Sequence, residues 1–168
     1  PMVAGLVELV DIAAKKIQPV AGLLFDFIFE AWTPKLPFFH LAQSLIEVLK
    51  EESVCYLSRL LPLLNETIVN DKDPYRSLAR SLFPLLLTIG KHLGGWLHML
   101  TPIIAIIDNS DLAAPVRNDA LSTLIELSEV VRFGAYAVQA FHALARTLET
   151  CSEMRDSAME MLFRLLHQ

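Results

Sequence analysis

The sequence predicts an all-α fold in which helices pair and stack as repeats. Two marks predict it, and each recurs about every 40 residues. The first is the eleven-residue pattern Arg-x-x-Ala-x-x-x-[Phe or Leu]-x-x-Leu, which starts at Arg76, Arg117 and Arg155. The second is an aromatic residue near the start of another apolar helical pattern, at Tyr56, Trp96 and Tyr136. A fixed period of this length is typical of α-α superhelices, in which each repeat packs only on its neighbours.

Apolar residues at three- and four-residue spacing predict about nine helices. Their expected ranges are 2–15, 18–32, 36–50, 54–69, 74–90, 95–108, 115–131, 134–149 and 152–167. Turn residues separate these ranges, and the short connections make consecutive helices antiparallel. If helices with the aromatic mark are named A and those with Arg-x-x-Ala are named B, the order is B, A, B, A, B, A, B, A, B.

The chain is therefore expected to be a single array, 1–168, of about four and a half repeats. The range 36–50 counts as a degenerate copy because it keeps the alanine register but has Phe39 in place of the arginine. Because the chain opens with Pro1-Met2, we expect it to be a fragment of a larger protein.

Helix ends are indicated by residues with known positional preferences. Pro74 and Pro115 are expected in first turns, where the missing amide proton costs nothing, and Asp73 is expected to cap the first of these helices. Gly94-Gly95 is expected to end a B helix.

One alanine per B helix is expected to face the paired A helix. Positions 0, +4 and +7 from this alanine lie on one helical face and are apolar, so the small side chain allows close approach while larger ones fill around it. These alanines are Ala42, Ala79, Ala120 and Ala158. Pro62 and Pro102 each follow the aromatic mark by six residues, and a bent A helix is typical of HEAT repeats. The sequence thus predicts a HEAT/armadillo-like solenoid.

Composition argues against several classes of protein. The chain has a net charge of −5 and no run of Lys or Arg, so it lacks the basic surface that nucleic acids require. Its longest uncharged stretch, 92–107, is too short for a bilayer span. Cys55 and Cys151 have no metal-binding or redox spacing, and we expect both to be reduced thiols in the cytoplasm.

Motifs for catalysis, cofactors and metals are not found in the sequence. The five histidines show no ligand spacing, no glycine-rich loop could hold a phosphate, and neither cysteine lies in a nucleophile motif. We therefore expect no catalytic, cofactor-binding or metal-binding residue, and no enzymatic activity of this chain.

The arginines of the repeat pattern are expected to form a structural ladder. Arg76, Arg117 and Arg155 would lie in the first turns of their helices, with acidic residues at the preceding junctions: Asp71 and Asp73, Asp108 and Asp111, and Glu149. Such pairs can satisfy free helix-end carbonyls and join successive repeats. A row that binds anions is the functional alternative.

Polar residues flank each pattern alanine, two positions before it and two after it. In the three clear copies these are Ser77, Ser81, Asn118, Ser122, Asp156 and Glu160. Stacking would align them into a mildly acidic stripe on the B helices, and we expect this polar stripe to bind a helix or peptide of a partner. A merely solvated face is the alternative.

Residues from about 54 to 168 resemble the HEAT-repeat region of target-of-rapamycin (TOR) protein kinases. Four stretches carry the resemblance: Trp96-Leu97-His98 with Leu100, Pro102, Ile103 and Asp108; Pro115 and Arg117 with Ala120-Leu121; Arg146-Thr147-Leu148; and Glu153 and Arg155 with Ala158-Met159. Residues 1–53 match no pattern of this family.

The resemblance implies a non-catalytic part of the solenoid that precedes the kinase domain of a Ser/Thr kinase. In that family the solenoid supports dimer assembly and docks adaptor subunits of the Raptor or Rictor type in nutrient and growth signalling. From the repeats alone, two other classes stay open: a HEAT adaptor of another kind, such as a transport receptor or phosphatase scaffold, and an enzyme.

Overall fold

The computed structural model describes residues 2–167, apart from the side chains of residues 14 and 15, and throughout this part the chain is helical without a strand. The α-helices are α1 (Met2–Ala13), α2 (Ala21–Glu30), α3 (Leu36–Leu49), α4 (Val54–Asn70), α5 (Ser77–Ile89), α6 (Leu100–Asp108), α7 (Ala114–Leu127), α8 (Tyr136–Thr150) and α9 (Arg155–Leu166). The predicted all-α class is confirmed.

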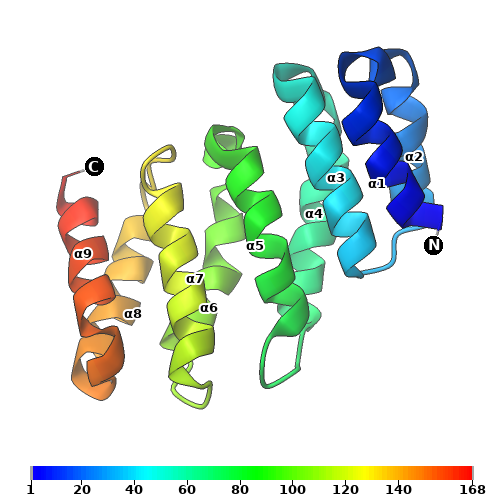
Figure 1. Ribbon diagram of the computed structural model, residues 1–168. Helices are drawn as coiled ribbons and strands as arrows, with labels where there is room; N and C mark the ends of the chain where they lie inside the picture. Colours follow the sequence, from blue (N-terminus) through cyan, green and yellow to red (C-terminus); the bar gives the residue numbers. More distant parts are fainter. Residues whose placement is uncertain (1, 168) are drawn as a thin grey trace.

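The helices form two layers of an elongated stack (Figure 1). The odd-numbered helices lie in one layer and the even-numbered helices in the other, with the two chain ends at opposite ends of the stack. Within each layer every helix packs on the next, as α3 does on α5 and α6 does on α8. The odd layer holds the predicted B helices and the even layer the predicted A helices, so the alternation read from the sequence is confirmed.

Four 3₁₀ segments shift helix ends from their predicted positions. Residues Ala14–Val20 are a 3₁₀ helix containing Pro19, so α2 begins at Ala21 instead of 18. Two further segments, Gly90–Gly95 and Leu97–Met99, delay the start of α6 to Leu100, and Ser152–Met154 delays α9 to Arg155. Pro102 consequently lies in the first turn of α6, and the prediction that it bends the middle of the helix is wrong.

The predicted caps of α5 are displaced by a few residues. Gly90, with φ 49°, ends the helix in place of Gly94-Gly95, because glycine adopts positive φ without a Cβ clash. At the other end α5 begins at Ser77, and Pro74 lies in the preceding turn instead of the first helical turn. Asp73 still acts on this helix end, since its carboxylate accepts a hydrogen bond from the Ser77 amide at 3.2 Å.

The interface between the layers is built as the register predicts. Ala42, Ala79, Ala120 and Ala158 are all fully buried. The aromatic mark of α4 packs within the even layer: the Tyr56 ring stacks on Phe25 of α2, with ring centroids 4.1 Å apart. Neither Cys55 nor Cys151 forms a disulfide bond within residues 2–167.

Candidate functional site

The polar stripe lies on α5, α7 and α9 of the odd layer. None of its six residues is buried: Ser77, Asp156 and Glu160 are exposed, and Ser81, Asn118 and Ser122 are partly exposed. The serines of α5 are already engaged within their own helix region, since Ser77 Oγ donates to Asp73 Oδ2 and Ser81 Oγ donates to the Ser77 carbonyl at 2.7 Å. On α9, Glu160 likewise accepts a hydrogen bond from Arg164 at 2.9 Å, so Asp156 is the most available acidic residue of the stripe for a partner.

The three pattern arginines do not share one arrangement. Arg117 is buried, donating from Nε to the Ile107 carbonyl at 2.8 Å and from one terminal nitrogen to Thr147 Oγ1 at 3.2 Å. Arg155 is exposed at the start of α9. Arg76 precedes α5 in a left-handed conformation, φ 48° and ψ 44°, so its placement in a first turn is wrong. Neither Arg155 nor Arg76 makes an ion pair within residues 2–167.

The repeats are joined by ion pairs of other residues, which sequence reasoning missed. Three pairs link two α-helices of the same layer: Arg59–Asp26, Arg80–Asp119 and Arg146–Asp108. Arg164 of α9 pairs with Glu129 in the turn after α7, and Lys91 pairs with Glu51 between the 3₁₀ segments Gly90–Gly95 and Lys50–Ser53. Partners are 33 to 40 residues apart in sequence. Because this separation is close to the repeat period, opposite charges one period apart were the signal that could have revealed them.

Asp108 pairs with Arg146 instead of with the pattern arginine Arg117. Both of its carboxylate oxygens accept hydrogen bonds from Arg146, each at 2.7 Å. These hydrogen bonds, with a smaller contribution from the positive charge of Arg117, hold the pKa of Asp108 below its ordinary value of 3.8. The acidic residue at this junction thus joins α6 to α8, while the pattern arginine takes the helix-end carbonyl next to it.

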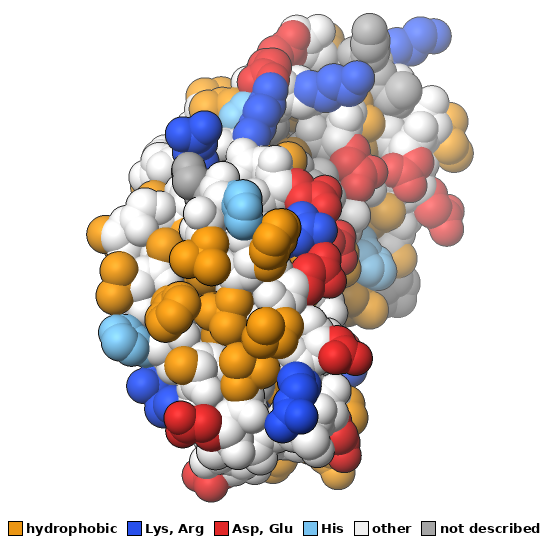
Figure 2. Space-filling model, turned by 90° about the vertical axis from the view of Figure 1, so that its left-hand side faces the viewer, with side chains coloured by type: hydrophobic (Ala, Val, Ile, Leu, Met, Phe, Trp, Pro, Cys, Tyr) orange, Lys and Arg blue, Asp and Glu red, His pale blue; other side chains and the backbone are white. Residues whose placement is uncertain are grey.

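An apolar face covers the α8–α9 end of the stack (Figure 2). It comprises exposed large side chains of both helices: Val138, Phe141, Met159, Phe163 and Leu166. A shallow hollow of about 230 Å³ lies within it, lined in part by Ala137 and Leu165. We call these residues the terminal apolar face. Contiguous exposed apolar area of this kind is typical of surfaces that contact other protein.

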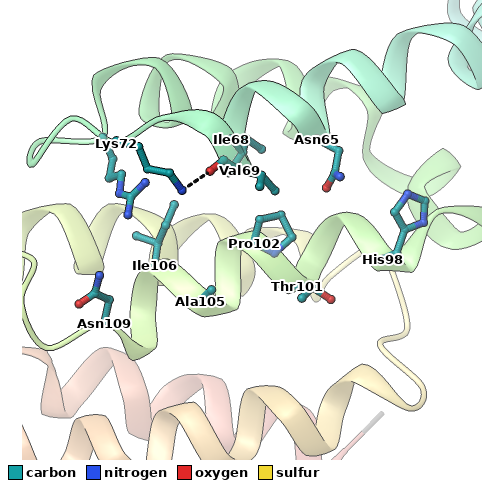
Figure 3. A pocket seen from close by; sticks show the side chains of 11 residues that line it. Asn65, Ile68, Val69, Lys72, His98, Thr101, Pro102, Ala105, Ile106 and Asn109 are labelled. Atoms are coloured by element: carbon teal, nitrogen blue, oxygen red, sulfur yellow. Dashed lines mark hydrogen bonds between the residues drawn. The ribbon is translucent and has the colours of Figure 1, made fainter.

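A larger hollow, of about 550 Å³, lies between α4 and α6 in the even layer (Figure 3). Apolar residues of both helices line its middle: Ile68, Val69, Pro102, Ala105 and Ile106. Polar residues lie toward its two ends, with Asn65 and His98 at one and Lys72 and Asn109 at the other. We call this hollow the α4–α6 groove. Its volume is in the range of sites that bind small molecules or short peptide segments.

Across the part of the chain that the structure describes, no three His, Cys, Asp or Glu residues gather closely enough to hold a metal ion. None of the helices described is both long and apolar enough to span a membrane.

Comparison with known proteins gives two relatives along most of the chain. It is 30% identical over 152 residues to the serine/threonine-protein kinase mTor of Drosophila melanogaster, a match that covers 88% of this chain. It is 26% identical over 171 aligned positions to the target of rapamycin homolog of Caenorhabditis elegans, covering 97% of the chain. No protein-family model matches. The chain spans 6% of the length of either relative. By sequence, the chain therefore corresponds to a segment of TOR-family proteins.

Proposed function

We propose that the chain is a non-catalytic scaffold segment of a TOR-like Ser/Thr protein kinase, acting in the cytoplasm. In this role it is a HEAT-repeat array that holds protein subunits together in nutrient and growth signalling. Its partners are adaptors of the Raptor or Rictor type, or the remainder of the kinase chain. The array supplies surfaces, and the phosphoryl transfer belongs to another part of the parent protein.

The observation that carries this proposal is the open end of the stack. A globular domain closes its core, whereas a solenoid leaves an apolar layer at each end that the next repeat or another protein covers. The terminal apolar face is such a layer, with Phe163 64% exposed and Leu166 73% exposed. The similarity to TOR kinases many times longer than this chain supports the same proposal.

The HEAT assignment is supported by the geometry of the repeat. Each repeat consists of two antiparallel helices, and a buried alanine of the odd-layer helix lies at the same register in four of them. In HEAT arrays the B helices line the inner surface, so the polar stripe is the surface that we assign to a partner segment.

Charge reversal on the stripe tests the proposal in the full-length parent kinase. The variant carries Asp156→Lys with Glu160→Lys, and the control carries Glu8→Lys with Asp11→Lys, two exposed acids of α1. The readouts are the amount of adaptor subunit that co-purifies and the phosphorylation of a short generic peptide. We expect the stripe variant to lose adaptor while peptide phosphorylation is kept, and the control to retain both.

The opposite pattern would contradict the proposal. If adaptor recovery is unchanged and peptide phosphorylation falls in the stripe variant alone, the segment acts on catalysis and not on assembly. Thermal unfolding of both variants must accompany the assay, because Glu160 accepts a hydrogen bond from Arg164 at 2.9 Å. Exposed pairs four residues apart contribute only about 0.3–0.5 kcal/mol, so we expect a small change in stability.

A further inference from the structure

The α4–α6 groove contains both of the side-chain atoms that lack a partner in the described interior. Asn65 Oδ1 and Arg76 Nε are buried and have no hydrogen-bond partner among residues 2–167. Both residues line the groove. Buried polar groups are satisfied in most proteins, and leaving one unpaired is unfavourable. Two such atoms in one hollow therefore indicate polar groups that a bound molecule would satisfy.

The backbone of Arg76 gives a further sign of a specialised position. It is one of two non-glycine residues with positive φ in the described chain. A left-handed conformation is unfavourable for a residue with a Cβ and persists where the surroundings impose it, often at binding sites. Here it places the arginine at the junction of α4 and α5, on the border of the groove.

One end of the groove is cationic although the protein as a whole is acidic. Lys72 and Arg76 lie there, and no Asp or Glu is among the residues that line the groove. Lys72 Nζ makes one hydrogen bond, to the Val69 carbonyl at 2.9 Å, and an ammonium group has two further donors. Asp73, next to Arg76, accepts hydrogen bonds from Ser77, which are the main cause of its lowered pKa, and the positive charge of Arg76 is a smaller one. This end is complementary to a carboxylate.

The dimensions match a short extended peptide. Asn65 lies on α4 and Lys72 lies two residues beyond the end of that helix, so the helical part between them, from Asn65 to Asn70, alone rises about 7.5 Å along the helix axis. Three residues of extended chain span about 10 Å. The apolar middle of the groove would contact side chains, and the Asn65 side-chain amide can pair with a main-chain amide, since it both donates and accepts.

We propose that the α4–α6 groove binds an acidic protein segment of about three residues, in which apolar residues precede an Asp or Glu. The carboxylate pairs with Arg76 and Lys72, the apolar side chains lie on Pro102 and Ala105, and a peptide group pairs with Asn65. The inference rests on the proposed scaffold role only in that the molecule bound in the groove is a protein. The groove lies in the even layer and is distinct from the polar stripe, which lies on the odd layer.

Titration of the 168-residue chain with a synthetic peptide tests the groove directly. The probe is acetyl-Ile-Leu-Asp-amide, its matched control is acetyl-Ile-Leu-Asn-amide, and amide NMR shifts report the site of binding. We expect shifts confined to α4, α6 and the turn before α5, with the Asn peptide at least about tenfold weaker because it loses the charge-assisted hydrogen bonds.

Three variants separate the groove from the rest of the surface. Arg76→Gln should lower the affinity for the Asp peptide to that for the Asn peptide. Ala105→Phe should prevent the binding of both peptides by filling the groove. Arg155→Gln, at an exposed arginine of the same sequence pattern, should leave binding unchanged. Amide spectra of each variant without peptide show whether its fold is kept.

Other outcomes would overturn the inference. They are the absence of NMR shifts in α4 and α6, equal affinity for the two peptides, or peptide affinity that is unchanged by Arg76→Gln and Ala105→Phe. Tighter binding of hexanoate than of the Asp peptide would also overturn it, because the groove would then be a site for small carboxylic acids. Because the assay uses synthetic peptides and the isolated chain, its failure leaves the adaptor assay on the parent kinase unaffected. A failure of that adaptor assay likewise leaves this one informative.

Discussion

Arg117 donates a hydrogen bond from Nε to the main-chain carbonyl of Ile107 at 2.8 Å, across the turn between α6 and α7. Its terminal nitrogen also reaches Thr147 Oγ1 of α8 at 3.2 Å. One buried side chain, 5% exposed, therefore ties three consecutive helices together. A helix-end carbonyl that would be left without a partner is satisfied by a residue of the next repeat element.

Replacing this arginine should destabilise the stack. Arg117→Met keeps most of the side-chain volume and removes both hydrogen bonds, leaving the Ile107 carbonyl without the guanidinium. We expect the free energy of unfolding in urea to fall by about 2–3 kcal/mol, since hydrogen bonds to charged groups are among the stronger ones. Arg155→Met, at an exposed site, should change it by less than about 0.5 kcal/mol. Equal effects of the two variants would contradict the structural role of Arg117.

Overfilling the interface between the layers should also lower stability. Ala120 is fully buried in α7, so Ala120→Leu adds three carbon atoms where there is no space. We expect a loss of about 1–3 kcal/mol in the free energy of unfolding. Ala4→Leu, on an exposed position of α1, is the matched control and should have little effect. An unchanged melting temperature for Ala120→Leu would mean that this side chain faces water.

The ion pair between Asp108 and Arg146 should make stability depend on pH in the acid range. Since the pKa of Asp108 is lowered in the folded protein, its contribution is present above the unfolded pKa, near 4, and is lost as the pH falls through the lower folded pKa. Asp108→Asn should therefore reduce the free energy of unfolding at pH 7, by less than about 1 kcal/mol because the pair is partly exposed.

The difference in the free energy of unfolding between Asp108→Asn and the unchanged protein should shrink as the pH falls below about 4. Arg146→Gln removes the other partner of this ion pair, so the free energy of unfolding of that variant should also depend less on pH in the acid range. The measurement is urea unfolding at pH 7 and pH 3 for all three proteins. A difference that stays constant between the two pH values would show that the pair does not stabilise the fold.

The terminal apolar face should make the isolated chain self-associate. Burying exposed apolar area is favourable by about 25 cal/mol per Å², so two copies can cover this face against one another. Sedimentation velocity should show a coefficient that rises with concentration, and Phe163→Ser should abolish the rise. Tyr75→Ser, at a residue 66% exposed in the turn before α5, should not. Identical behaviour of both variants would contradict this assignment.

The register of the repeats was predictable because it depends on what must be buried. The alternation of helices and the burial of Ala79 and Ala120 follow from apolar spacing and side-chain size alone, and both are found in the structure.

The arginine ladder was harder to predict because it depends on turns that differ. The turn before α5 runs from Asp71 to Arg76 and leaves Arg76 outside the helix, whereas the shorter turn before α7 brings Arg117 inside it. The partner of Asp108 lies a whole repeat away, at Arg146.

Hydrogen–deuterium exchange of the full-length parent kinase, with and without its adaptor subunit, tests the scaffold role most directly. The account predicts that the adaptor slows amide exchange in the stripe segments 77–81, 118–122 and 156–160. In the variant Asp156→Lys with Glu160→Lys, exchange at the catalytic residues of the kinase domain should be the same as in the unchanged kinase. Unchanged exchange in all three segments on adaptor binding would contradict it.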